Sequence, residues 1–443
     1  MSSVLRFALP IFLLCLLPTT LPADPTPAPA RELSAPVSEK LGALRELTDA
    51  KNYPAALAWL NPVIETVPGD SYDLAILSQI KAQIILDQGG PTGPAVAPLE
   101  TALRLGDAHG YLDPHQTQEV LYLLAQLHYQ RATESREADV QGAEFSAAAG
   151  AIRRWLSATA RPGEDAWLLA SLIYYNEATV GTHPAAAALR EVLAAAGQGL
   201  KQSLQPKESL YLLILAAEQQ LGETAASADL LELLVQRTPG NRDYWQQLGA
   251  TYLALAGGAK DATDTRRYNL RALLTFERAQ SHGFLQTPAD NFNVAGLYFT
   301  LGQYDRAIDR LESGLRTGAI ADEPGHWELL ADACRQAHQE TRALADLNGA
   351  AALHPADGRI NYALARLDYG LDQPADARTQ LEAALAKGHL DHPGEAALLL
   401  AYLDTEAHQL AEAARWLDEA ARHPDASADD LARLRQALTG QTK

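Results

Sequence analysis

The stretch YWQQLGATYLAL, residues 244–255, places Trp245, Leu248, Gly249 and Tyr252 on one face of a helix. A glycine inside a helix costs roughly 1 kcal/mol relative to alanine, so Gly249 calls for a packing reason. That reason is repetition, because the same spacing of three, one and three residues recurs four times downstream. The later members are Asn291/Val294/Ala295/Tyr298, Trp327/Leu330/Ala331/Cys334, Asn361/Leu364/Ala365/Asp368 and Ala397/Leu400/Ala401/Asp404.

A second helical pattern follows each of these stretches and is built on alanine. Five alanines are separated by 35, 36, 34 and 36 residues, and each is followed by a bulky residue and then a small one. The sets are Ala272/Phe276/Ala279, Ala307/Leu311/Gly314, Ala343/Leu347/Ala350, Ala377/Leu381/Ala384 and Ala413/Leu417/Ala420. A register held over five periods indicates a tandem repeat of two antiparallel helices. We expect the small residues to let the two helices approach closely.

This layout resembles the tetratricopeptide repeat (TPR). The Trp…Leu-Gly…Tyr and Ala…Phe…Ala motifs stand where that family has them, as do prolines after second helices at Pro68, Pro239 and Pro355. The resemblance implies an all-α fold, a right-handed α-solenoid of antiparallel helix pairs (the TPR superhelix) with a C-terminal capping helix. We expect ten helix pairs between Val37 and Pro424 and a final helix over residues 429–438.

The expected organisation has five parts. A signal peptide (1–23) and a Pro/Ala-rich linker (24–36) precede degenerate TPR-like repeats (37–240), a regular TPR array (241–424), and a capping helix with a tail (425–443). Residues 89–98 are rich in glycine and proline and are predicted to be a loop. Residues 257–267 add about eleven residues between the two helices of the Trp245 repeat, and we expect a mobile surface loop there.

The first residues have the anatomy of an export signal. Arg6 precedes an apolar run over residues 7–17, and Ala23 could precede a cleavage point. The run is too short for a comfortable membrane span, which needs about twenty residues. Secretion is the favoured interpretation, and an uncleaved anchor or lipidation at Cys15 are the alternatives. No later segment reads as a transmembrane helix, so we expect an exported, soluble, periplasmic protein.

Composition narrows the partners. Lys+Arg 36 against Asp+Glu 55 gives a net charge of -19, which repels phosphate backbones and argues against nucleic acid. The same charge favours basic partner segments, although it also serves solubility. Cys15 and Cys334 cannot form an internal disulfide framework, since Cys15 lies in the leader.

The sequence offers little sign of catalysis. It has no phosphate-binding loop, no His-Glu-x-x-His pair and no Gly-x-Ser-x-Gly elbow, and we predict no enzyme activity and no cofactor. His389 and His392 flank Asp391 at a spacing that could hold a metal ion, but a polar loop between helices is the favoured interpretation, since zinc would need further ligands. Cys334 is predicted to be a small buried hydrophobe rather than a nucleophile.

Binding is the better class of function, because the first helices of such repeats line one concave side of the solenoid. If they follow the family's geometry, nine residues face a peptide-binding groove. They are Phe292, Phe299, Glu328, Asp332, Arg335, Tyr362, Arg366, Tyr369 and Tyr402. Aromatic rings and arginines anchor peptides well. For Phe292 and Phe299 packing between repeats is the favoured role, whereas Tyr362, Arg366 and Tyr369 are assigned to the groove.

A narrower resemblance concerns the ends of the second helices. The segments SHGFLQTP (281–288), RTGAIADEP (316–324) and AKGHLDHP (386–393) each have glycine, one further residue and a hydrophobe. Together with DYWQQLGATYLAL and AEAARWLDEAARHPDA they are similar to exported TPR proteins encoded with TonB, ExbB and ExbD. That similarity implies a periplasmic adaptor for basic, Pro-rich envelope proteins. The alternative is a helical-repeat enzyme or regulatory subunit whose active site lies in the groove or on a partner chain.

Overall fold

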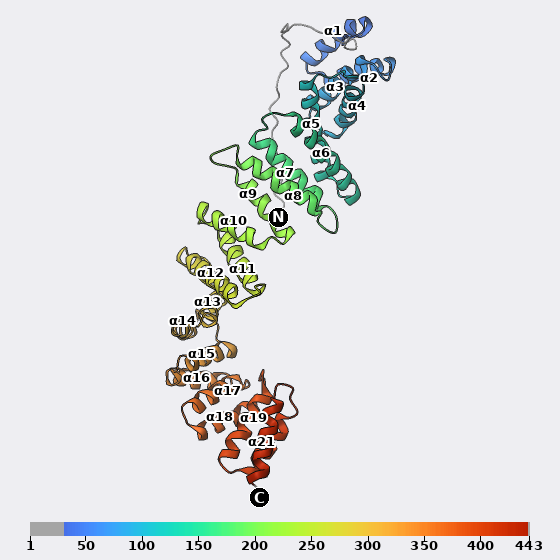
Figure 1. Ribbon diagram of the computed structural model, residues 1–443. Helices are drawn as coiled ribbons and strands as arrows, with labels where there is room; N and C mark the ends of the chain where they lie inside the picture. The colour runs from blue at the N-terminus through green and yellow to red at the C-terminus, as the bar shows by residue number, and fades with distance from the viewer. Residues whose placement is uncertain (1–30, 442–443) are drawn as a thin grey trace. The chain divides into compact units, whose positions relative to one another are not determined.

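The computed structural model describes residues 31–441, and within them it contains 21 α-helices, one short 3-10 helix and no strand. The predicted signal peptide, most of the predicted linker and residues 442–443 lie outside the described residues. The described chain divides into two compact units between residues 217 and 218. Each unit is an all-α array of helices in tandem, as the sequence predicted (Figure 1).

The first unit holds α1 to α8 and most of α9. The bounds are α1 Ala35–Asp49, α2 Tyr53–Thr66, α3 Tyr72–Asp87, η1 Gly93–Ala95, α4 Val96–His109, α5 Pro114–Glu134, α6 Ala138–Ala158, α7 Glu164–Thr179, α8 Ala186–Leu200 and α9 Glu208–Leu221. The predicted loop at residues 89–98 therefore contains η1 and the first turn of α4. Inside this unit Nδ1 of His128 in α5 lies 2.6 Å from a carboxylate oxygen of Glu144 in α6, and Glu144 also pairs with Arg131 at 2.7 Å.

The second unit carries the regular repeats and the capping helix. The bounds are α10 Thr224–Arg237, α11 Arg242–Gly257, α12 Ala262–Ser281, α13 Pro288–Thr300, α14 Tyr304–Thr317, α15 Pro324–Gln336, α16 Glu340–Leu353, α17 Arg359–Gly370, α18 Pro374–Lys387, α19 Pro393–Glu406, α20 Leu410–Ala420 and α21 Ala428–Gln441. In α21, Leu438 is buried against α19 and α20, and Leu431 and Leu434 pack beside it. The C-terminal capping helix is thus confirmed.

The repeat pattern of the sequence is the core of this unit. All five ladder alanines, Ala272, Ala307, Ala343, Ala377 and Ala413, are 0% exposed. At Gly249, an added Cβ would stand 2.9 Å from the ring of Phe276 on the neighbouring helix. The glycine therefore leaves room for the phenylalanine ring between α11 and α12. Later repeats have an alanine and a leucine at the same two positions. The packing reason predicted for Gly249 is confirmed.

Helix ends are fixed by local chemistry. α13 begins with a capping box in which Thr287 and Asp290 bond each other's backbone, and Pro288 occupies its first turn. α14 ends at Gly318, which adopts a left-handed conformation with φ 76°. The hydrophobe that follows, Ile320, is 1% exposed and its amide donates to the carbonyl of Gly314. The Gly-x-hydrophobe signature thus closes the second helix and returns the chain to the core.

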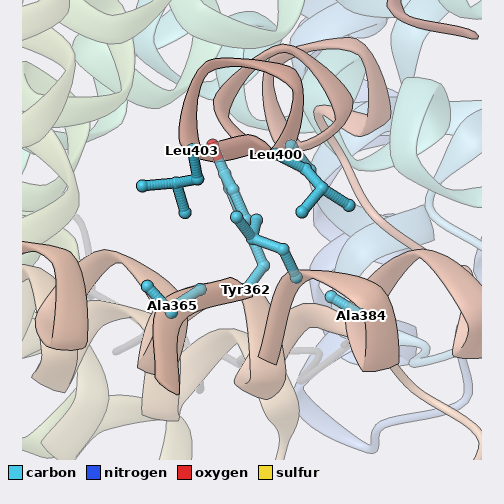
Figure 2. Close-up of a cluster of buried hydrophobic side chains, with 8 residues drawn as sticks. Tyr362, Ala365, Ala384, Leu400 and Leu403 are labelled. Carbon is cyan, nitrogen blue, oxygen red and sulfur yellow. The ribbon is translucent and has the colours of Figure 1, made fainter. Parts of the chain in front are cut away.

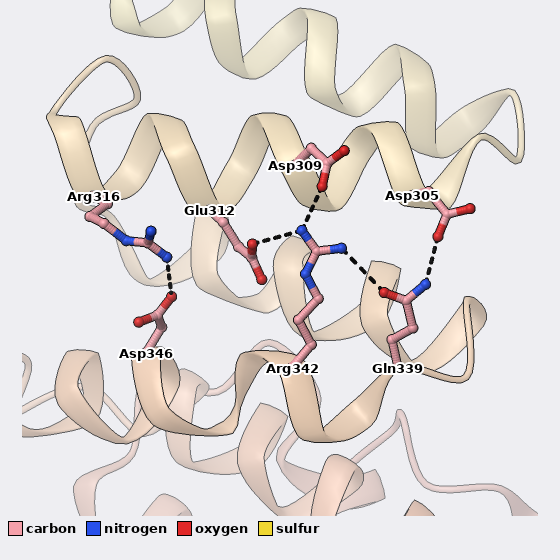
Figure 3. Close-up of polar contacts among 7 residues, drawn as sticks. All are labelled: Asp305, Asp309, Glu312, Arg316, Gln339, Arg342 and Asp346. Atoms are coloured by element: carbon pink, nitrogen blue, oxygen red, sulfur yellow. Dashed lines mark hydrogen bonds and ion pairs between the residues drawn. The ribbon is translucent and has the colours of Figure 1, made fainter.

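Ion pairs join consecutive second helices on the solvent side. Arg342 of α16 contacts Asp309 at 2.5 Å and Glu312 at 2.9 Å, both on α14 (Figure 3). Arg316 of α14 reaches Asp346 of α16 at 3.2 Å. These contacts fix the lateral register of two neighbouring repeats, although exposed pairs of this kind each contribute less than about 1 kcal/mol.

The expectation of a mobile loop at residues 257–267 is wrong. α11 runs to Gly257 and α12 already begins at Ala262, so most of the insertion is helical. Asp261 caps α12 by accepting from the amide of Asp264 at 2.8 Å. The Tyr268 ring stacks on that of Tyr252 at 6.5 Å, which holds the added turns of α12 against α11. The insertion therefore lengthens a helical hairpin.

Candidate functional site

The predicted groove residues come from four consecutive first helices of the second unit: α13, α15, α17 and α19. These helices carry the predicted residues on one side, which faces solvent. We call this side the helix A face. On α15, Glu328, Asp332 and Arg335 follow one another at helical spacing and share a side. On α17, Arg366 and Tyr369 do the same, and Tyr402 lies on α19. The Asp332–Arg366 ion pair and the Tyr369–Tyr402 ring contact join these residues into one stripe over three helices, with α13 at its edge.

An arginine cluster joins α15 to α17 on this face. One carboxylate oxygen, Oδ1 of Asp332, lies 3.2 Å from a guanidinium nitrogen of Arg335 and 3.0 Å from one of Arg366. Each guanidinium has five N–H donors in a rigid fork, and a single carboxylate cannot satisfy both. Their side chains are 36% and 32% exposed. The cluster therefore has guanidinium N–H groups that Asp332 does not satisfy, and part of both side chains is open to solvent.

Tyr369 and Tyr402 form an exposed aromatic pair beside this cluster. Their ring centroids are 6.3 Å apart and the rings meet edge to face at 88°. They remain 45% and 39% exposed. The proximity of Tyr369, the negative charge of Glu406 and a hydrogen bond with Tyr369 raise the pKa of Tyr402. The two exposed rings offer an apolar contact surface next to guanidinium hydrogen-bond donors.

Glu328 gives the face a titratable carboxyl group. Burial raises its pKa from 4.5 to about 7, and the charges of Asp391, Asp332 and Asp357 add to the rise, while Arg359 opposes it. Arg359 is itself held by Asp357 at 2.8 Å. A carboxyl group with this pKa is close to half-protonated at neutral pH. A basic side chain placed beside it would favour its ionised form.

Tyr362 is a correction to the sequence prediction. Its side chain is 9% exposed and packs against Leu400 and Leu403 of α19, with Ala365 and Ala384 on its other side (Figure 2). Burial raises the pKa of its hydroxyl to about 12. The ring belongs to the core between two repeats, because the next first helix covers it. Only its edge is shared with the surface, where Arg366 lies 5.7 Å from the ring centroid.

Phe292 and Phe299 are half-buried and meet other rings. Phe292 of α13 lies 3.8 Å from the centroid of His326 on α15, and Phe299 lies 5.5 Å from Tyr304 on α14. Both rings thus fill space between helices, which agrees with the packing role favoured for them. Asp357, Arg359 and Asp391, which act on Glu328, were not predicted. They lie in connections or at a helix start, where helical periodicity gives no signal.

Two open recesses lie away from the helix A face. One of about 610 Å³ is lined by residues of α12, α13 and α14 and their connections, namely Glu277, Gln280, Ser281, Gln286, Asn291, Arg310 and Ala319. Another of about 590 Å³ lies between α4 and α6 in the first unit. Neither contains a predicted groove residue.

Residues singled out for chemistry have ordinary surroundings. Within residues 31–441 no group of three or more His, Cys, Asp and Glu side chains could hold a metal ion, and His389 and His392 are exposed. Cys334 is 0% exposed, and burial raises the pKa of its thiol to about 12. It is the small buried residue that the repeat register predicted.

No protein-family model and no curated protein matches the chain. Among solved structures, YrrB, described as a TPR protein with an unusual peptide-binding site, is 15% identical, with coverage of 49% of this chain and 100% of that one and a TM-score of 0.34. PilF of Pseudomonas aeruginosa is 15% identical, with coverage of 51% of this chain and 95% of PilF and a TM-score of 0.35. The P58(IPK) TPR domain is 12% identical, with coverage of 92% of this chain and 100% of that domain and a TM-score of 0.23. These proteins are similar to the chain in fold class.

Proposed function

We propose that this protein is a non-enzymatic scaffold that binds an extended segment of a partner protein on the helix A face of α15, α17 and α19. The observation that carries the proposal is the exposed Tyr369–Tyr402 pair beside the Arg335–Asp332–Arg366 cluster. Tyrosine and arginine are, with tryptophan, the side chains enriched among binding hot spots. The rings supply buried area, and the spare guanidinium donors bind backbone carbonyls of the partner.

The partner segment is basic and proline-rich in this proposal. The chain has a net charge of -19, and Glu328, with its raised pKa, gains from a nearby cation. Proline keeps a segment extended and lowers the entropy lost on binding. The similarity of the helix ends to TPR proteins encoded with TonB, ExbB and ExbD supports an envelope protein of an energy-transducing complex as the partner.

Export to the periplasm belongs to the same proposal. Its support is the sequence of residues 1–23, with Arg6 before an apolar run and Ala23 after it. None of the helices described in residues 31–441 is long and apolar enough to cross a membrane. Determination of the mature N-terminus by mass spectrometry after expression in a Gram-negative host tests the signal. An intact leader on a cytoplasmic product would contradict it.

The binding face is tested with a labelled Lys-Pro repeat peptide and fluorescence anisotropy. The double variant Tyr369→Ala/Tyr402→Ala should lower the affinity at least about tenfold, which corresponds to about 1.4 kcal/mol, because both anchors are removed. Leu353→Ala is the matched control, since Leu353 is 72% exposed at the end of α16 and off this face. Unchanged binding by the double variant, or equal binding of a Glu-Pro peptide, would refute the proposal.

The folded state should survive these substitutions, because both rings are more than a third exposed. Helical circular dichroism and the thermal midpoint of the double variant should therefore stay close to wild type. A cooperative loss of helix would show that the rings serve packing. The loss of binding would then result from unfolding and not from the loss of contacts on the helix A face.

A further inference from the structure

The repeat formed by α11 and α12 differs from the others in length. α14, α16, α18 and α20 each begin three residues before their ladder alanine, whereas α12 begins ten residues before Ala272. The additional seven residues are two further turns of helix, and α11 is longer too. They pack against α11 through Tyr268, whose ring stacks on that of Tyr252 at 6.5 Å. Within α12, Arg267 lies over the Tyr268 ring at 4.6 Å and pairs with Asp264 at 3.1 Å. One repeat of the array thus carries an elongated hairpin.

The solvent side of α12 is apolar at positions where the second helices of the other repeats have polar or small residues. Leu270 and Leu274, two residues before and after the ladder alanine, are 41% and 47% exposed. The same two positions of the other repeats hold Asp305/Asp309, Thr341/Ala345, Ala375/Thr379 and Ala411/Arg415. Repeat packing therefore does not require leucine here. Two exposed leucines one turn apart on the elongated helix call for another purpose.

Arginines surround these leucines in a chain that is otherwise acidic. Residues 258–281 hold five basic and three acidic side chains. Arg267 and Arg278 lie on the same helical side as the leucines, one at each end, and Arg266 flanks them on the added turns. Arg278 pairs with Glu232 at 3.1 Å and is 43% exposed. We call Arg266, Arg267, Leu270, Leu274 and Arg278 the α12 stripe.

We propose that the α12 stripe is a second docking surface, separate from the helix A face, and that it binds an acidic amphipathic helix of a partner protein. Leucines at 270 and 274 supply the spacing that an apolar helix face matches. Carboxylates on the flanks of such a helix would meet arginine at both ends of the stripe.

Other occupants fit less well. An α12 stripe against that of a second copy would bring arginines against arginines in either orientation, because they stand at both ends. An anionic bilayer is flat, so it would also meet the neighbouring α14, where Asp309 and Asp305 are exposed at the equivalent positions. A single helix is narrow enough to contact the stripe alone.

The test uses a labelled helical peptide of about 20 residues, with leucines at heptad a and d positions and glutamates beside them, titrated into the full chain. Leu270→Asp/Leu274→Asp should weaken binding at least about tenfold, and Arg266→Ala/Arg267→Ala should weaken it and flatten its salt dependence. The aspartates copy Asp305 and Asp309 of α14, so the fold should tolerate them. Arg310→Ala on α14 is the control and should leave binding unchanged.

Further measurements separate the α12 stripe from the helix A face and decide between occupants. Tyr369→Ala/Tyr402→Ala should bind this peptide as wild type does, which separates the α12 stripe from the proposed helix A function. Affinity weaker than about 1 mM, equal binding of the lysine counterpart, or equal binding by the leucine variant would overturn the inference. Sedimentation of the wild type with phosphatidylglycerol vesicles, or self-association that the leucine variant loses, would assign the α12 stripe to a membrane or to a second copy instead.

Discussion

Gly249 and Phe276 should be energetically coupled, and a double-mutant cycle measures this directly. In Gly249→Ala the new Cβ would stand 2.9, 3.1 and 3.3 Å from three ring atoms of Phe276. Carbon atoms prefer about 3.5–4.0 Å, so the ring must move by roughly half an ångström or more. Phe276 is only 7% exposed and has little free space. Overpacking costs about 1–3 kcal/mol, and the better helix propensity of alanine offsets about 1 kcal/mol.

The double variant Gly249→Ala/Phe276→Leu should recover most of the loss. It installs the alanine and leucine pairing that four later repeats use, as in Ala295 with Leu311. Phe276→Leu alone leaves space beside glycine and should cost about 1 kcal/mol or more. The coupling free energy should be about 1–3 kcal/mol in favour of the double variant. Urea denaturation followed by circular dichroism gives the four free energies, and hydrogen exchange localises the effect to α11 and α12. Additivity within about 0.5 kcal/mol would refute the packing argument.

Gly358→Ala should destabilise the protein by about 3 kcal/mol, because a Cβ there would meet backbone carbonyls as close as 2.2 Å. Urea denaturation measures this loss. The control Gly349→Ala places its Cβ in open space on α16 and should be neutral or stabilising. Arg342→Ala should lower the free energy of unfolding by about 1 kcal/mol at low ionic strength, because it removes two ion pairs. The decrease should be smaller in 1 M salt. The folded pKa of Glu328 is raised from 4.5 to about 7, so this group's contribution to stability is greatest below 4.5 and declines as pH rises to about 7. Unfolding free energies at pH 5 and 8 should therefore differ less in Glu328→Gln than in wild type.

The repeat architecture could be predicted because packing imposes a period on the sequence. The ladder alanines, the bulky residues four positions later and Gly249 lie in the core because two helices can approach closely only across small side chains. The same logic identified Cys334 as a buried residue, since its register places it between helices. A period of about 35 residues held over five repeats carries more information than any single helix.

Three features were not predicted, and two of them, the burial of Tyr362 and the pKa of Glu328, depend on neighbours in the fold rather than on period. Tyr362 has the spacing of a surface residue, yet the following helix covers its ring. Residues 257–267 begin with two glycines, which favour a loop, although Asp261 followed by Asp264 is the signature of a helix start. The pKa of Glu328 likewise depends on Asp357 and Asp391, which only the folded chain brings near.

Site-specific photo-crosslinking in the living cell shows whether the helix A face binds another polypeptide. A photoreactive residue is placed at Tyr402 and, as the control, at Leu353, which are 39% and 72% exposed. If the helix A face binds a partner, position 402 should crosslink to a discrete basic segment of one protein, the crosslink should be lost on Tyr369→Ala, and position 353 should give none. Equal crosslinking from both positions, or none to protein from position 402, would contradict it.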